Sequence, residues 1–207
     1  MNSLRPLDKV NILGAGGHCR SVIGLLKSCG FAVDGIYDIS FLEGNMETIL
    51  GIPLRGTVPA GDLKVILAIG DNTKRREQFE NLHNRVYLSS LIHPSAEVLP
   101  DTFLGEANLV FPQCCINNAV RIGNNNILNT ASVIEHECIL GDHNHISVGA
   151  LLCGRVKIGS RCFIGAGAVV IDGITIGDDV IVGAGAVVIN DLEDHGTYVG
   201  NPARKIK

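Results

Sequence analysis

An aliphatic residue occurs at every sixth position from Val98 to Val188, sixteen times in succession and without an insertion. The residue two places earlier is Ala, Thr, Asn, Cys, Val or Ser, and only Ile174 is larger. An α-helix requires a period of 3.6 residues and an exposed strand alternates at two, so neither explains this spacing. A fixed period of six predicts a parallel β-helix, in which each hexad forms one short side and the turn after it.

The hexads resemble those of the hexapeptide-repeat proteins. That resemblance implies three sides to each coil, so 18 residues make one turn of the β-helix and the repeat provides slightly more than five coils. It also implies a left-handed winding, against the usual right-handed crossover rule.

Residues 1–90 have a different pattern, in which apolar strands alternate with helical segments. This alternation predicts a small parallel sheet with helices on its faces. We therefore expect an α/β Rossmann-like N-terminal domain (1–90) followed by a left-handed parallel β-helix (91–207). The expected elements are strands at 9–13, 31–37 and 64–69, a helix at 21–28 ended by Gly30, and a polar helix at 71–84 capped by Asp71 or Asn72.

Composition excludes several other classes of protein. The net charge of -4 gives no reason to expect a nucleic-acid partner. No apolar run approaches the ~20 residues that span a bilayer, and the N-terminus lacks the apolar centre of a signal peptide. We therefore expect a cytoplasmic protein with no membrane insertion. The seven cysteines contain no CxxC pair, and Cys114, Cys138 and Cys162 occupy small slots of the repeat, so we interpret them as reduced packing residues.

A glycine-rich turn, Gly14-Ala-Gly-Gly-His18, follows the first expected strand. Such a turn brings main-chain N–H groups close to a phosphate at a helix N-terminus. Cys19 stands where the full dinucleotide fingerprint has glycine, so a plain tight turn remains an alternative. Asp38, at the end of the second strand, favours a nucleotide because that position usually reaches a ribose or base. A domain this small suits a single nucleotide better than NAD.

Three titratable residues, Glu135-His136-Glu137, interrupt the otherwise uniform hexads. A lone histidine on a β surface is usually a bystander, but an adjacent carboxylate orients an imidazole and stabilises its protonated form. A base of this kind suits an amine or hydroxyl that attacks a thioester. At a spacing of 18, Asn118 and Gly154 share the corner of His136, where Asn118 could form a hydrogen bond and Gly154 would leave room for a substrate.

His145 follows His136 by nine residues, which is half a coil, so the two imidazoles of one chain should point to separate parts of the cross-section. If both serve one site, two subunits must build it, and a trimer is the natural closed arrangement. A metal site that includes His143 is the alternative, as in a hexapeptide-repeat carbonic anhydrase. That alternative leaves the acids beside His136 and the nucleotide-type turn without a role, so we expect no metal.

The whole set of motifs resembles one family, the bacterial sugar acyltransferases that include sialic acid O-acetyltransferases and UDP-4-amino-sugar N-acetyltransferases. The motifs are GAGGH, Asp38, LNTAS, IEHECILGDHNHIS, the paired GAGAVV segments and YVGNPARKI. Within this family, the chain is most similar to the N-acetyltransferases that complete UDP-di-N-acetylbacillosamine.

The resemblance assigns roles to individual residues of this chain. It implies that His136 is the general base, with Glu137 and Asn129 beside it in the catalytic site. It also implies a nucleotide-sugar substrate, acetyl-CoA as co-substrate and a homotrimer with active sites between subunits. The implied acetyl-CoA contacts are His145, Ala166 and Ala184, and the implied nucleotide-sugar contacts are Gly16, Gly17, His18, Asp38 and Gly56.

Three further functions remain open from the sequence. One is O-acetylation of sialic acid or another sugar hydroxyl, and another is N-acetylation of a GDP- or dTDP-linked amino sugar. The third, from a different class, is a non-catalytic nucleotide-sugar sensor that keeps the fold. A covalent acetyl-cysteine route is disfavoured because Cys138 occupies a small packing slot.

Overall fold

The computed structural model describes residues 8–41, 47–58, 61 and 63–207 of the chain. The chain divides into two compact units, Met1–Tyr87 and Leu88–Lys207. The division falls three residues before the boundary expected from the sequence. Each unit is described separately below.

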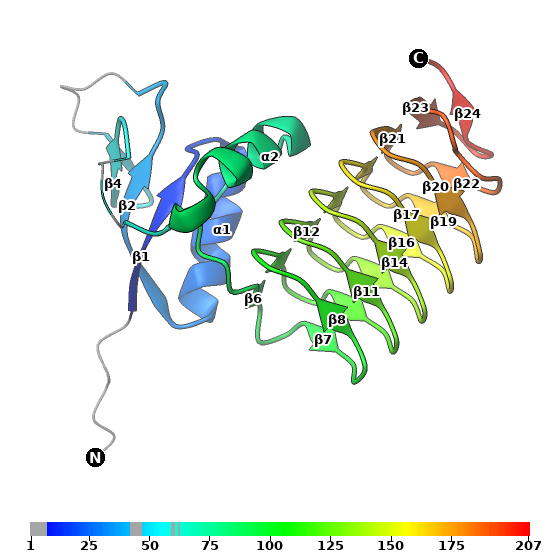
Figure 1. The fold of residues 1–207 in the computed structure, drawn as a ribbon, viewed down its shortest axis with the longest axis horizontal. Coiled ribbons are helices and arrows are strands. Elements are labelled where there is room, and N and C mark those ends of the chain that lie inside the picture. The colour runs from blue at the N-terminus through cyan, green and yellow to red at the C-terminus, as the bar shows by residue number, and fades with distance from the viewer. Residues whose placement is uncertain (1–7, 42–46, 59–60, 62) are drawn as a thin grey trace. The chain divides into compact units, whose positions relative to one another are not determined.

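The N-terminal unit is a five-stranded sheet in the order β3-β4-β2-β1-β5 (Figure 1). Strands β4, β2, β1 and β5 are parallel neighbours, and β3 is antiparallel to β4. The carboxyl ends of β1, β2 and β5 therefore share one edge of the sheet. The elements are β1 (Asp8–Leu13), α1 (Gly17–Ser28), β2 (Phe31–Tyr37), β3 (Thr48–Ile49), β4 (Ile52–Arg55), β5 (Val65–Leu67), α2 (Asn72–Asn81) and the 3₁₀ turn η1 (His83–Arg85).

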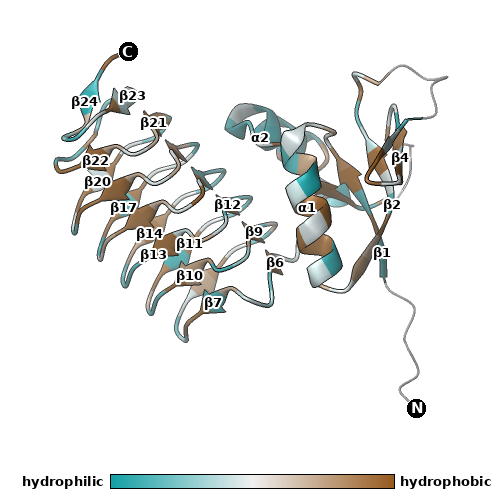
Figure 2. Ribbon diagram, turned by 180° about the vertical axis from the view of Figure 1, so that it is seen from behind, coloured by the Kyte–Doolittle hydropathy of each residue, from teal (hydrophilic) through white to brown (hydrophobic). Residues whose placement is uncertain are grey.

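The expected elements of this unit are present, with two differences. Helix α1 begins at Gly17, four residues earlier than predicted, because Gly16 acts as its N-cap in an extended conformation. The helix buries Val22, Ile23 and Leu26, and Figure 2 shows apolar and polar residues alternating along it. The short strands β3 and β4 were not predicted. The Asp71 side chain caps α2 by accepting a hydrogen bond from the Lys74 N–H at 2.8 Å, as the sequence predicted.

The second unit is the predicted β-helix of hexapeptide repeats, with three parallel sheets along its sides (Figure 1). Sheet 1 contains β7 (Glu97–Val98), β10 (Cys115–Ile116), β13 (Val133–Ile134), β16 (Leu151–Leu152), β19 (Val169–Val170) and β22 (Val187–Val188). Sheet 2 contains β8 (Phe103–Leu104), β11 (Arg121–Ile122), β14 (Ile139–Leu140), β17 (Lys157–Ile158) and β20 (Thr175–Ile176). Sheet 3 contains β6 (Leu91–Ile92), β9 (Leu109–Val110), β12 (Ile127–Leu128), β15 (His145–Ile146), β18 (Phe163–Ile164), β21 (Val180–Val182), β23 (Gly196–Val199) and the antiparallel β24 (Arg204–Lys205).

The register confirms a coil of 18 residues. Ile116 pairs with Ile134, and Ile134 pairs with Leu152 one coil further along. These aliphatic residues of the hexads form the core, where they are buried from Val110 onward, while Val98 and Leu104 of the first hexads are partly buried. The first residue of each two-residue strand points the other way, as the alternation of side chains in a strand requires. The interior of the coil is therefore built almost wholly from the repeating aliphatic residue and the small residue before it.

Polar residues in the small slots are also part of this interior. The side-chain carbonyl of Asn108 accepts a hydrogen bond from the main-chain N–H of Asn126. The side-chain carbonyls of Asn126 and Asn144 accept in the same way from the residue one coil further along, each at an N···O distance of 2.7 Å. Buried polar groups are tolerated when they are hydrogen-bonded in this way. This ladder of hydrogen bonds explains why asparagine replaces Ala or Val at several inward positions.

Left-handed backbone occurs at every corner of the coil, and most of these positions carry residues other than glycine. The second turn residue has positive φ whatever its side chain, as at Glu137 (62°) and Arg155 (59°). The glycines that follow the aliphatic residue serve close packing instead. A Cβ atom at Gly105, Gly123 or Gly141 would lie 2.6–2.9 Å from a carbonyl oxygen of the next coil.

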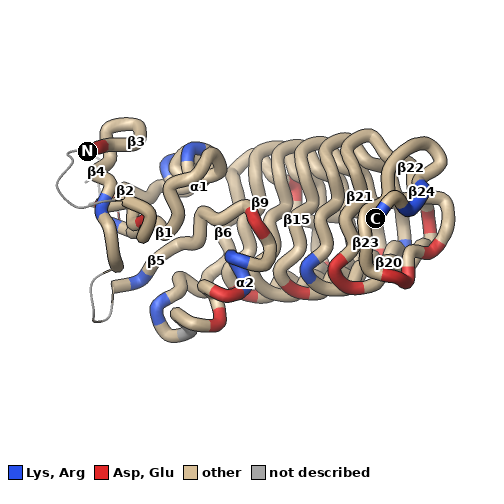
Figure 3. Tube along the Cα trace, turned by 90° about the horizontal axis from the view of Figure 1, so that it is seen from above, with Lys and Arg blue, Asp and Glu red and all other residues tan. Residues whose placement is uncertain are grey.

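Acidic residues recur along the turns of the β-helix (Figure 3). In the turns between sheets 2 and 3, Asp142 accepts the Asn124 N–H at 2.6 Å and Asp178 accepts the Ser160 N–H at 2.8 Å. These carboxylates therefore connect one coil to the next. None of the helices in the described part of the chain is long and apolar enough to cross a membrane.

Candidate functional site

The glycine turn of the N-terminal unit connects the end of β1 to the start of α1. The N–H of Gly14 donates to Tyr37 O at 2.8 Å, which joins the turn to the end of β2. No side chain caps α1. A Cβ atom on Gly16 or Gly17 would project into open space, so these glycines keep the helix N-terminus accessible. An uncapped helix N-terminus of this kind favours an anionic group.

A cavity of about 770 Å³ lies at this edge of the sheet, beside the ends of β1, β2 and β5. Its volume is in the range of small-molecule sites. Four of the five predicted substrate contacts, Gly16, Gly17, His18 and Asp38, line it. Gly56 directly follows β4 and is not among the described residues that line the cavity. The other lining residues are Leu13, Gly14, Ile39, Ser40, Ala68, Ile69, Gly70, Asp71, Lys74, Glu77 and Gln78.

The Asp38 carboxylate holds the walls of this cavity together. One oxygen accepts the Ala15 N–H at 2.8 Å, and the other accepts the N–H and hydroxyl of Ser40 at 3.0 and 2.6 Å. Burial alone would raise the pKa of Asp38, but these hydrogen bonds outweigh it and lower the pKa below its ordinary value. A carboxylate has about four acceptor positions. Asp38 therefore shapes the turn and uses three of these positions within the chain.

His18 is an uncharged group in this cavity at neutral pH. Burial and the nearby guanidinium of Arg75 lower the pKa of His18 to about 4. An uncharged imidazole can donate one hydrogen bond and accept another, but it contributes no positive charge toward a phosphate. Among the described residues that line the cavity, the cation is Lys74 of α2. Lys74 and Arg75 were not singled out from the sequence, because a polar helix gives no pattern that distinguishes them from solvated residues.

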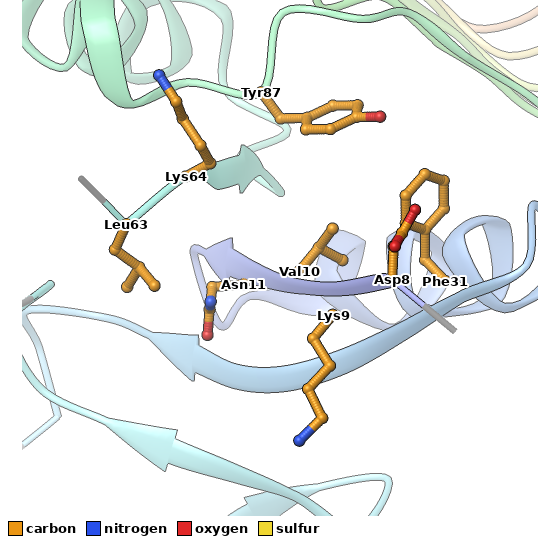
Figure 4. A pocket seen from close by; sticks show the side chains of 8 residues that line it. All are labelled: Asp8, Lys9, Val10, Asn11, Phe31, Leu63, Lys64 and Tyr87. Carbon is orange, nitrogen blue, oxygen red and sulfur yellow. The ribbon is translucent and has the colours of Figure 1, made fainter. Parts of the chain in front are cut away.

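A second, smaller hollow of about 420 Å³ lies at the other end of β1 (Figure 4). Its lining includes Asp8, Lys9, Phe31 and Tyr87. The rings of Phe31 and Tyr87 pack edge-to-face. The hollow has neither a glycine turn nor a helix N-terminus. It therefore lacks the features that favour a phosphate, and we assign the candidate nucleotide site to the larger cavity.

In the β-helix, His136 and Glu137 form the turn between β13 and β14. Stacking fixes the main chain of this turn on both sides, because the Glu137 N–H donates to Asn118 O at 3.1 Å and His136 O accepts the Arg155 N–H at 2.9 Å. The imidazole Nδ1 lies 3.1 Å from a Glu137 carboxylate oxygen. The His136 side chain is 46% exposed and that of Glu137 is 58% exposed. The pair is therefore both ordered and accessible.

Gly154 lies beneath the imidazole of His136, one coil further along. A Cβ atom at Gly154 would approach the His136 Cε1 and Nε2 atoms to 2.6 and 2.7 Å. The sequence predicted that Gly154 leaves room for a substrate; in this chain the space is taken by the His136 ring. On the other side of His136, Asn118 contributes its main-chain carbonyl to the turn.

Glu135 does not contact the imidazole in the way that Glu137 does. Its carboxylate accepts a hydrogen bond from the Asn117 side-chain amide at 2.7 Å, between two stacked coils. The two acids of the motif therefore have different partners. Glu137 orients the imidazole, and Glu135 joins neighbouring coils.

His145 lies in β15 of sheet 3, away from the turn of His136. Its Nε2 atom is 3.1 Å from the Asn129 amide nitrogen, and its ring packs edge-to-face on Phe163 at a centroid distance of 5.0 Å. Within one chain, the structure thus groups the predicted catalytic residue Asn129 with His145 and not with His136. Ala166 and Ala184 are exposed in the turns that follow sheet 3, on the same edge as the turn after Asn129.

The alternative chemistries are less well supported by these contacts. His143, part of the metal alternative, is buried, and its Nδ1 atom is 2.8 Å from the Asn125 amide nitrogen. In the described part of the chain, no three His, Cys, Asp or Glu side chains come together as a metal site. The Cys138 thiol is buried and donates to Cys153 O at 3.2 Å, and burial raises its pKa to about 11, so it is a protonated packing residue.

The fold and these two candidate sites define a hexapeptide-repeat acyltransferase with an N-terminal α/β domain. Comparisons with known proteins agree. Residues 9–82 match the model of the PglD N-terminal domain, and residues 155–189 match the hexapeptide repeat of succinyl-transferase. Among curated proteins there was no match.

Several solved structures are similar to the chain over almost its whole length. A histidine-to-asparagine mutant of perosamine N-acetyltransferase from Caulobacter crescentus, in complex with CoA and GDP-perosamine, is 38% identical over 98% of both chains, with a TM-score of 0.90. The acetyltransferase domain of PglB from Neisseria gonorrhoeae, in complex with acetyl coenzyme A, is 31% identical over 97% of this chain and 100% of that one (TM-score 0.86). WeeI from Acinetobacter baumannii is 27% identical over 97% and 100% (TM-score 0.84).

The chain belongs to the PglD-like family of bacterial sugar acetyltransferases.

Proposed function

We propose that the protein transfers the acetyl group of acetyl-CoA to the 4-amino group of a nucleotide-linked amino-dideoxy sugar, of the UDP-N-acetylbacillosamine type. The observation that carries this proposal is the exposed His136–Glu137 pair, with Nδ1 to carboxylate at 3.1 Å, in a family whose solved members include complexes with CoA, acetyl coenzyme A and a nucleotide-linked amino sugar. The cavity at the glycine turn supports a nucleotide-sugar because it combines a helix N-terminus with Lys74.

His136 is the general base in this proposal. The Glu137 carboxylate accepts a hydrogen bond from the Nδ1–H group of His136, which leaves the lone pair of Nε2 available to take a proton from the incoming nucleophile. The sugar amine attacks the thioester carbonyl carbon, and Nε2 accepts the amine proton. The tetrahedral intermediate then collapses, the carbon–sulfur bond breaks, and the imidazolium returns the proton to the CoA thiolate. No covalent acetyl-enzyme is needed.

The acetyl-CoA contacts proposed for this chain are His145, Ala166 and Ala184. Their support is their common position, because β15 and the turns that follow sheet 3 lie along one edge of the β-helix. The hydrogen bond between Asn129 and His145 fixes the imidazole on this edge. Small exposed residues in the turns leave their main chain accessible to an extended pantetheine.

The separation of His136 from His145 and Asn129 supports a site shared between subunits. His136 is in the turn that follows sheet 1, and Asn129 lies just before sheet 1. Four of the six outer residues of the sheet between them are uncharged aliphatic side chains that are only half-buried in one chain: Val133, Leu151, Val169 and Val187. We propose that subunits of a homotrimer meet along this edge, so that His136 of one chain faces His145 and Asn129 of the next.

Two experiments test these proposals. The purified protein is incubated with acetyl-CoA and a panel of UDP-, GDP- and dTDP-linked 4-amino sugars and free sialic acids, and mass spectrometry identifies the acetylated product. We expect an N-acetylated UDP-sugar; a GDP-linked product is the second candidate, favoured by the perosamine N-acetyltransferase relative. Acetylation of sialic acid alone would contradict the proposal, and absence of acetyl-CoA binding would favour a non-catalytic sensor.

The second experiment mixes inactive His136→Ala and His145→Ala chains after partial denaturation. If sites are shared, mixed trimers contain sites with both native histidines and regain activity. If every site belongs to one chain, mixing restores nothing.

A further inference from the structure

Several large side chains of the described structure are fully buried, and among them Arg75 carries a charge. Only 1% of its surface is exposed. It is the fourth residue of α2, a helix whose other described residues are half-buried or exposed. Burial lowers the pKa of its guanidinium to about 9, against the favourable effect of Asp71, so it remains charged at neutral pH. A buried charge of this kind requires a compensating set of hydrogen bonds.

The partners of Arg75 are in the loop that joins β5 to α2 and at the first residue of α2. Nη1 donates to the carbonyl oxygens of Ile69 and Gly70 at 3.1 and 3.3 Å, and Nη2 donates to the side-chain carbonyl of Asn72 at 2.7 Å. One planar group thus holds two carbonyl groups of the loop and the first residue of α2. The ammonium group of lysine cannot reproduce this fixed fork of donors.

The same loop forms a wall of the candidate nucleotide-sugar cavity. Ile69, Gly70 and Asp71 line it, together with His18 of α1. A Cβ atom at Gly70 would lie 3.8 Å from the His18 Cβ atom, so the loop packs directly against this histidine. Arg75 itself does not line the cavity.

We propose that Arg75 is a positioning residue for this site: its guanidinium fixes the β5–α2 loop against His18 and so determines the shape of the cavity wall that meets the nucleotide-sugar. This proposal rests on the proposed function for the identity of the ligand, but the arrangement of Arg75, the loop and His18 can be tested without it.

The arrangement also governs the charge of His18. The charged or titratable groups around His18 are Arg75, Asp71, Lys74 and Glu77 from the α2 side, Asp38 from the β2 side, and Cys19 and Arg20 on its own helix. Burial is the larger cause of the lowered pKa of His18, and the guanidinium of Arg75 opposes protonation of the imidazole further. Removal of Arg75 should therefore raise the pKa of His18 toward its ordinary value, because the nearby positive charge is lost and because a loop that is no longer held exposes the imidazole to water.

The test compares Arg75→Met and Arg75→Lys with the control Arg76→Met. Arg76 is the next residue of α2, is half-exposed and pairs with Glu80 at 3.7 Å, and does not line the cavity. Steady-state kinetics give KM for the nucleotide-sugar and for acetyl-CoA, and histidine Cε1–H NMR signals, assigned with His18→Gln, give the titration of His18. Thermal unfolding verifies that each variant folds.

For Arg75→Met and Arg75→Lys we expect KM for the nucleotide-sugar to rise about tenfold, the effect of losing hydrogen bonds to a charged group. KM for acetyl-CoA and the kinetics of the control should stay unchanged, and His18 should titrate at higher pH in Arg75→Met. A folded Arg75→Met variant with a native KM for the nucleotide-sugar would overturn the proposal, and so would an unshifted His18. If Arg75→Met does not fold, a native KM for the nucleotide-sugar in Arg75→Lys would overturn the proposal that the planar guanidinium donors hold the loop.

Failure of the proposed function would appear differently. In that case the wild-type protein itself acetylates none of the nucleotide-sugars, and the NMR titration of His18 alone decides whether Arg75 controls the loop.

Discussion

The two units build their candidate sites in opposite ways. In the N-terminal unit, the cavity is formed largely by main chain where three strands end, and side chains such as Asp38 and Arg75 hold that main chain in place. In the β-helix, the main chain repeats every 18 residues, and the candidate site is made by placing His136 and Glu137 on a corner that other coils form with other residues. The comparison shows that the same chain obtains one site from loop shape and the other from side-chain chemistry alone.

The strongest test of this contrast is His136→Ala. If the chemistry depends on one side chain on an unchanged scaffold, kcat should fall about 10²–10⁴-fold, the usual contribution of a general base. Acetyl-CoA binding and thermal stability should stay close to wild type, because the turn is held by its main chain. Asn190→Ala, an exposed position three coils further along the same corner, is the control. A variant with native turnover would contradict the role of His136.

A finer test is Gly154→Ala. Position 154 does not have a positive φ, and the equivalent corners of the neighbouring coils carry His136 and Asp172, so the backbone accepts a Cβ atom. That atom would occupy the place of the His136 ring and displace it. We expect kcat to fall roughly ten- to hundredfold, because a catalytic group displaced by about 1 Å can lower the rate up to about a hundredfold. The melting temperature should change little. Asn118→Ala serves as the control, and equal losses in both variants would rule out this explanation.

In the N-terminal unit, the matching test is Gly17→Ala. A methyl group at this first position of α1 meets no other atom of the chain, but it projects beside the cavity. The protein should become slightly more stable, by about 0.4–1 kcal/mol, while KM for the nucleotide-sugar rises about tenfold or less. Gly24→Ala, on the same helix and also free of close contacts, gives the stability change alone. Unchanged KM in Gly17→Ala would place the phosphate elsewhere.

The smallest expected effect is on stability as a function of pH. The pKa of His18 is about 4 in the folded protein and 6.5 in the unfolded chain, so the unfolded chain binds the extra proton first as the pH falls. The free energy of unfolding should therefore decrease between about pH 6.5 and 4, by about 1 kcal/mol from pH 7 to 5.5. Urea unfolding at several pH values measures this, and His18→Gln should remove that part of the dependence. The same slope in both proteins would show that His18 is not responsible.

The sequence predicted the β-helix well because its fold depends on local, repeated choices. Each aliphatic residue at a spacing of six points inward, and the register of 18 follows from three sides per coil. The same regularity hid the details of the site. Nothing in the hexads showed that Glu135 would bind Asn117 while Glu137 binds His136, or that Gly154 makes room for the imidazole.

In the N-terminal unit the sequence identified the glycine turn and Asp38, because main-chain requirements leave a readable pattern. It did not identify Arg75, whose importance comes from burial beneath a loop. Helix propensity and polarity are the same for a buried and a solvated arginine in such a helix. Contacts between segments distant in sequence decide this difference, and a single sequence does not display them.

The uniform coil has a consequence for how this scaffold changes in evolution. Gain or loss of 18 residues, one complete coil, leaves every remaining corner facing the same direction and translates the rest of the solenoid by one strand spacing of about 4.8 Å. The distance between two functional positions along the solenoid can therefore change in steps of one coil, without any change to the packing of the interior. An insertion of six or twelve residues has a different result, because it rotates everything beyond it onto another side of the triangle.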